Sequence, residues 1–105
     1  MELRSRPSAD NSAMELVCVG EFDLGAVPAW RSVVLELLRD GWSSIVVDLT
    51  EVTFIDSAGL GALIGLRRRC RDAQGALTLI PSPEVSRVLE AAEIEALFSS
   101  SVGPR

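Results

Sequence analysis

Short apolar runs alternate along this chain with longer segments whose apolar residues recur at helical spacing. The runs at 45–49 and 76–80 are nearly continuous, as expected of strands buried on both faces of a sheet. The segment 26–39 places its apolar residues on one helical stripe, a second helix is expected over 57–73, and a third begins near 83. Strands and helices that alternate in this way predict an α/β layer with a largely parallel sheet.

The beginning of the chain predicts an antiparallel hairpin. Turn-forming residues at 8–13 separate an edge strand at 2–6 from a firmer strand at 14–20. We therefore expect a mixed, mostly parallel sheet of four to five strands with helices packed against it. This is the α/β fold class.

The length allows one domain and is too short for two. We expect a single domain over residues 1–105, with its core at about 14–98 and a frayed tail at 99–105.

The composition excludes several classes of function. All ten basic residues are arginine, and the chain has neither lysine nor histidine. A histidine base, a histidine metal ligand and a Schiff-base lysine are therefore excluded. The net charge of −5 argues against nucleic-acid binding. No apolar run is long enough to span a membrane, and the N-terminus lacks the apolar region of a signal peptide. We expect a cytoplasmic protein that does not insert into membranes.

Cys18 and Cys70 each lie within an apolar element and lack the spacing of a metal site. The two thiols could be buried and free, or they could form a redox pair. We favour buried, reduced thiols that react slowly.

The segment Thr53–Gly61 ends an apolar run in Asp56 and Ser57, and a helix start made of small residues follows at once. Either of the two side chains can cap the helix by accepting hydrogen bonds from its first backbone N–H groups. A helix start also carries a partial positive charge that favours a phosphate. A serine hydroxyl at this point is well placed to be phosphorylated, and the alternative is a plain helix cap.

Asp23 and Asp56 follow two different strands, in the kind of loop where α/β proteins gather their function. A pair of carboxylates there could form a metal site or a phosphoryl-aspartate site, as in a receiver domain. That chemistry normally uses a cluster of acids together with a lysine, and this chain has no lysine. We reject the receiver hypothesis and expect neither a metal site nor catalytic residues.

The second helix contains three glycines, Gly59, Gly61 and Gly65, each of which costs about 1 kcal/mol relative to alanine in a helix interior. Close packing of the helix on the sheet is one explanation. The other is a flat face that a partner's backbone can approach, made of Ser57, Gly61, Ile64 and Arg68.

A basic cluster follows on the same helix, at Arg67–Arg69 and Arg71. A solvated helix face is the simpler interpretation. Binding of a phosphate or lipid headgroup is the alternative, which the acidity of the whole chain weakens.

Three segments together resemble the STAS family, and within it the bacterial anti-sigma-factor antagonists. They are Gly20-Glu21-Phe22-Asp23, Ile45-Val46-Val47-Asp48-Leu49 and Val52-Thr53-Phe54-Ile55-Asp56-Ser57-Ala58-Gly59-Leu60-Gly61. The resemblance extends from about Met14 to Phe98. The Asp-Ser-x-Gly-Leu core is specific because an apolar strand and a Gly-Glu-apolar-Asp segment precede it at this distance.

The resemblance implies a serine phosphoacceptor at Ser57, flanked by Asp56 and Asp23. In such proteins the unphosphorylated form binds an anti-sigma factor, which is also a serine kinase of the histidine-kinase-like ATPase fold, and so releases a sigma factor. Phosphorylation by that kinase ends the interaction, and a serine phosphatase restores it. The chain itself would then be no enzyme and would need no cofactor, since ATP and Mg²⁺ belong to the kinase. We expect it to be monomeric when free.

We expect Asp23 and Asp56 to matter for phosphorylation or docking more than for stability. Ala58 stands where many members carry a second serine, which leaves one acceptor. The residues expected to contact the partner are Glu21, Ala58, Gly59, Gly61, Ile64 and Arg68.

STAS domains also serve as non-phosphorylated subunits of membrane lipid transporters, of the ABC type. The arginine cluster keeps this alternative open. The presence of Ser57 counts against it, because those subunits often carry another residue there.

Overall fold

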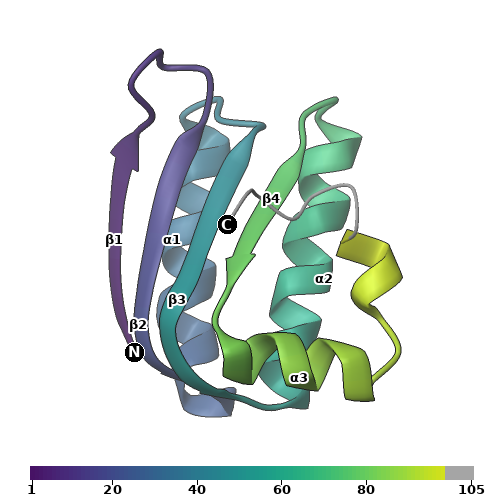
Figure 1. Cartoon of the computed structure of the whole chain (residues 1–105). Coiled ribbons are helices and arrows are strands. Elements are labelled where there is room, and N and C mark those ends of the chain that lie inside the picture. The colour runs from purple at the N-terminus through teal and green to yellow at the C-terminus, as the bar shows by residue number, and fades with distance from the viewer. Residues whose placement is uncertain (99–105) are drawn as a thin grey trace.

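The computed structural model describes residues 1–98, which form one four-stranded sheet with three helices packed on it (Figure 1). The strands are β1 (Glu2–Pro7), β2 (Met14–Phe22), β3 (Ile45–Ile55) and β4 (Leu77–Pro81). The helices are α1 (Val27–Arg39), α2 (Ser57–Asp72) and α3 (Pro83–Ala91), and the short 3-10 helices are η1 (Leu24–Ala26) and η2 (Glu95–Phe98). The predicted α/β class is confirmed, and the tail predicted at 99–105 lies outside the described residues.

The sheet has the strand order β1-β2-β3-β4. β1 runs antiparallel to β2, with Leu3 opposite Cys18, so the predicted hairpin is confirmed. β2, β3 and β4 are parallel and follow one another in the same direction across the sheet. Because crossovers between parallel strands are right-handed, two successive crossovers in one direction place their helices on the same face. α1 and α2 accordingly lie side by side behind the sheet, and α3 crosses the ends of β3 and β4 (Figure 1).

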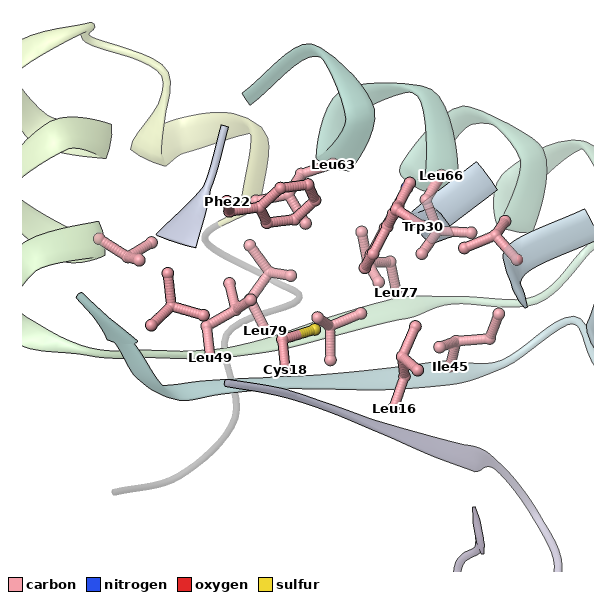
Figure 2. Packing of buried hydrophobic residues seen from close by; sticks show 14 of the residues in the cluster. Leu16, Cys18, Phe22, Trp30, Ile45, Leu49, Leu63, Leu66, Leu77 and Leu79 are labelled. Carbon is pink, nitrogen blue, oxygen red and sulfur yellow. The ribbon is translucent and has the colours of Figure 1, made fainter. Parts of the chain in front are cut away.

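The core lies between this face of the sheet and the two helices. Figure 2 shows side chains such as Leu16, Cys18 and Leu79 pointing from the strands toward α2 and α1. At one end of this layer the ring of Phe22 packs against Trp30, with 4.9 Å between ring centroids.

The opposite face of the sheet carries no helix in the described part of the chain. In β3 buried residues therefore alternate with half-buried ones, such as Val46 and Asp48. The prediction that 45–49 is buried on both faces is wrong, because both crossover helices lie on one side. β3 also continues beyond Leu49 to Ile55, so that Asp56 directly follows the strand.

Local sequence signals set the ends of α1. Pro28 occupies the first turn, where its missing N–H has no helical partner to lose. Beyond the last turn Gly41 adopts a φ of 95°, and its N–H donates to the carbonyl of Leu38 at 3.0 Å. A left-handed residue just after a helix is the usual way to end it, and glycine adopts that conformation without strain.

Candidate phosphorylation site at the start of α2

The site lies where β2 and β3 end, at the lower edge of the sheet in Figure 1. Asp23 follows β2 and Asp56 follows β3, and the parallel pairing of these strands brings the two loops together. The backbone N–H of Asp56 donates to the carbonyl oxygen of Phe22 at 3.3 Å. The two acids predicted to lie in loops of the same kind are therefore neighbours in the fold.

Asp56 is the N-cap of α2, and both of its carboxylate oxygens accept hydrogen bonds from the backbone. Oδ1 accepts from the N–H of Gly59 at 3.0 Å, and Oδ2 accepts from the N–H of Leu24 at 3.3 Å. The sequence allowed either Asp56 or Ser57 to be the cap, and the structure assigns that role to Asp56. The same carboxylate also ties η1 to the start of α2.

Asp23 has a similar role one element earlier. It is the N-cap of η1, and its Oδ1 accepts from the N–H of Ala26 at 3.2 Å. Replacing an N-cap residue by alanine typically costs about 1 kcal/mol. Both acids therefore have a structural function as caps, and the expectation that they matter more for phosphorylation or docking stays a prediction.

Ser57 is the first residue of α2 and its side chain is exposed. Within residues 1–98 its hydroxyl makes no hydrogen bond. Ser82 shows the contrast: it caps α3, is buried, and donates to the carbonyl of Val52 at 2.7 Å. Ser57 thus presents an accessible hydroxyl at a helix N-terminus, where the partial positive charge favours an anion.

Two large apolar side chains near the ends of β2 and β3 are exposed, and sequence reasoning missed both. Leu24 is 70% exposed on η1 and is held there by its bond to Asp56. Phe54 is 49% exposed near the end of β3, opposite Glu21 in the strand register. Leu24 is therefore available for contact with a partner close to the start of α2. The sequence signal that could have indicated the exposure of Leu24 is its position between Asp23 and Gly25, in a loop.

Most residues expected to contact a partner lie at the surface, with Arg68 about three turns along α2 from Ser57. Gly61, Arg68 and Glu21 are exposed, and Ala58 and Ile64 are half-buried.

Gly59 is the exception, because it is buried against β2. A Cβ at this position would lie 2.8 Å from Cγ1 of Ile55 and closer still to the carbonyl oxygen of Phe22. The prediction of a partner contact does not hold for Gly59, whose missing side chain lets α2 pack on the strand ends.

The two cysteines are free and buried, as the favoured interpretation predicted. Burial raises the pKa of Cys18 to about 12, with a smaller contribution from the charge of Asp48, and burial raises the pKa of Cys70 to about 11. Both thiols are therefore protonated at neutral pH.

Residues 1–98 contain no group of three or more Cys, Asp or Glu residues that could hold a metal ion. No helix among them has the length and apolar character to cross a membrane.

Comparison with known proteins identifies relatives over almost the whole chain. A STAS-domain containing protein of Pseudomonas aeruginosa is 33% identical over 102 residues, covering 96% of this chain and 100% of that protein. The anti-sigma-B factor antagonist of Staphylococcus aureus is 26% identical over 104 residues, covering 98% of this chain and 96% of the relative.

Solved structures with the same fold include the anti-sigma factor antagonist SpoIIAA in its unphosphorylated form, with a TM-score of 0.77 and 19% identity over 97% of this chain and 86% of that one. The Bacillus protein SpoIIAA in its phosphorylated form has a TM-score of 0.75 at 19% identity, covering 97% of this chain and 89% of that one. Part of the murine anion transporter Slc26a9 also matches, with a TM-score of 0.73 and 16% identity over 89% of this chain and 16% of the transporter. The model of the STAS domain matches residues 4–104, and the chain belongs to the STAS-domain family.

Proposed function

We propose that this chain is an anti-sigma-factor antagonist whose binding is switched by phosphorylation of Ser57. The observation that carries the proposal is the division of roles at the start of α2: Asp56 caps the helix, and the hydroxyl of Ser57 stays unbonded and exposed. Two comparisons support it. A curated relative is an anti-sigma-B factor antagonist, and a protein of the same fold has been solved in unphosphorylated and phosphorylated forms.

The unphosphorylated surface suits a protein partner. Near the neutral hydroxyl of Ser57 lie the exposed Leu24, whose backbone N–H bonds to Asp56, and the open surface over Gly61. The partner is an anti-sigma factor that is also a serine kinase of the histidine-kinase-like ATPase fold. Its capture releases a sigma factor. The kinase supplies ATP and Mg²⁺, a serine phosphatase reverses the modification, and this chain acts by binding alone.

A phosphate on Ser57 changes this surface while leaving the fold in place. It adds roughly −1.5 to −2 charges at neutral pH. The cap on Asp56 is retained, so α2 keeps its first turn. The partner would then have to desolvate an anion beside Asp56 and Asp23, which costs several kcal/mol without a cationic group to pair it. Each 1.4 kcal/mol corresponds to a tenfold loss of affinity.

The test is incubation with the cognate kinase and ATP, followed by intact-mass analysis and site mapping. We expect one phosphate, on Ser57, which is lost in Ser57→Ala and retained in the control Ser32→Ala, an exposed serine of α1. Ser57→Asp should weaken partner binding at least tenfold, and Ser57→Ala should bind and resist the switch. The proposal fails if the protein gains no phosphate, or if Ser57→Ala is still modified.

A subunit of a membrane transporter complex is the alternative function. The fold shared with part of Slc26a9 and the exposed arginines of α2 favour it. It predicts a chain that co-purifies with a membrane protein and gains no phosphate from a serine kinase.

A further inference from the structure

A groove of about 370 Å³ lies between α1 and α2, next to the Ser57 site. On its α2 side the lining includes four small residues, Ala58, Gly61, Ala62 and Gly65, together with Leu66 and Arg69. The α1 side is largely apolar and includes Val27 and Leu35, and the exposed Leu24 also lines it.

The two glycines of this lining have no role in packing the described residues. A Cβ built at Gly61 or Gly65 would meet no atom within 4 Å, whereas one built at Gly59 would collide with β2. An interior helical glycine costs about 1 kcal/mol relative to alanine. Gly61 and Gly65 therefore keep space free above the helix, as is typical where another backbone must approach closely.

Charge indicates what enters the groove. Arg31 of α1 and Arg69 of α2 both line it, and both are exposed. Neither forms an ion pair with any residue in 1–98, although the chain carries 15 acidic residues. A carboxylate on the occupant could pair with these guanidinium groups, because arginine binds carboxylates through bidentate hydrogen bonds.

The length of the groove favours a helix as the occupant. The lining residues Ala58, Ala62, Gly65 and Arg69 recur at i, i+4, i+7 and i+11 on α2. This spacing corresponds to about 16 Å, or three helical turns. A partner helix lying alongside would place apolar side chains over the glycines at one or two successive turns.

We infer that this groove receives an amphipathic helix of the anti-sigma partner, with apolar side chains over Gly61 and Gly65 and a carboxylate between Arg31 and Arg69. The inference rests on the proposed function, since it names a second contact of the same partner. Because the groove begins at Ala58, one partner can occupy it and contact Ser57 together.

The first test fills the groove and reverses its charge. The probe is the purified anti-sigma factor that phosphorylates the wild-type chain, taken from the same organism. It is titrated into each variant, and binding is measured by calorimetry. Gly65→Leu and Arg69→Glu should each weaken binding at least tenfold. The control positions on α3, Ala91→Leu and Arg87→Glu, are also exposed, and these variants should bind like the wild type. Gly65→Leu folds because the space above it is open, and circular dichroism verifies this.

A second test identifies the segment in the groove. Leu24→Cys, labelled with a benzophenone maleimide, places a photoreactive group beside the groove. The native thiols are buried and protonated, so the new cysteine is labelled selectively. The cross-link should map to an acidic amphipathic helix of the anti-sigma factor, and exchange of its carboxylate for a lysine should restore binding to Arg69→Glu.

The outcomes separate the two proposals. If Ser57 is phosphorylated and switches binding while Gly65→Leu and Arg69→Glu bind like the wild type, the groove inference is overturned and the proposed function stands. A cross-link to a segment that is not helical, or that lacks a carboxylate, also overturns it. If no anti-sigma factor binds or phosphorylates the wild-type chain, both proposals fail.

Discussion

Replacing the glycines of α2 one at a time separates those that serve packing from those that serve binding. Gly61→Ala and Gly65→Ala each place a methyl group in open space, since an added Cβ meets no atom within 4 Å. Alanine is the better helix former by about 1 kcal/mol. We expect each variant to raise the free energy of unfolding by that amount, and the melting temperature by roughly 4–8 °C. The double variant should gain about 2 kcal/mol, because neither methyl contacts another group.

Gly59→Ala should have the opposite effect. Its Cβ would lie 2.8 Å from Cγ1 of Ile55 and 3.1 Å from Cδ1 of Phe22, and still closer to the carbonyl oxygen of Phe22. That oxygen belongs to a strand and accepts from the N–H of Asp56, so it cannot move alone. Overpacking of this kind costs about 1–3 kcal/mol, which outweighs the gain in helix propensity.

The assay is urea unfolding at 25 °C, followed by the fluorescence of Trp30 and Trp42; Trp30 is 3% exposed and packs on Phe22. Equal denaturant slopes for all variants would show that only stability has changed. Loss of stability in Gly61→Ala or Gly65→Ala would mean that the helices need these glycines for packing. The two glycines would then serve the packing of the helices and not an occupant of the groove.

Three further predictions concern the thiols and the helix caps. The chain has no Lys, Tyr or His, so Cys18 and Cys70 are the side chains that titrate between pH 9 and 12. Folding raises the pKa of both thiols, so their contribution to stability is complete below pH 9 and is lost as pH rises through about 11 to 12. Urea unfolding at increasing pH should show this decline in the wild type. A Cys18→Ala/Cys70→Ala variant should not show it. Asp56→Ala removes two hydrogen bonds and should lower the unfolding free energy by about 1 kcal/mol or more in the same assay. Ser82→Ala leaves the carbonyl of Val52 without its partner and should cost about 1–3 kcal/mol, whereas an unchanged midpoint would mean that another group replaces the hydroxyl.

The fold was predictable where the signals are local. The hairpin followed from turn residues between two strands, and the end of α1 from a glycine after an apolar stripe. One-sided burial of the sheet was not predictable, because it depends on the strand order and on the direction of the crossovers. Val46 and Val47 are adjacent and chemically identical, yet one is half-buried and the other is buried. Only the position of α1 and α2 decides between them.

The same distinction applies to the candidate site. The Asp56-Ser57 pair was visible in the sequence because a helix cap involves residues three apart, here Asp56 and Gly59. The bond from Leu24 to Asp56 joins residues 32 positions apart, and no local pattern reports it. The position of the exposed Leu24 and the groove between the helices depend on such long-range packing, and both required the structure.

The charges on α2 indicate how a switch at Ser57 and a contact in the groove can act separately. The capping carboxylate of Asp56 precedes the helix, and Arg69 and Arg71 occupy its last turn. The helix dipole stabilises the negative charge at the N-terminus and the positive charges at the C-terminus. Ser57 and Arg69 are 12 residues apart, or about 18 Å along the axis, which exceeds two screening lengths at physiological salt. A phosphate on Ser57 therefore hardly changes the attraction of the groove for a carboxylate. Phosphorylation would remove the contact at the start of α2 and leave the groove contact intact. The phosphorylated chain would then keep weak, salt-sensitive binding to the same partner, and a titration of the phosphorylated chain at two salt concentrations measures it.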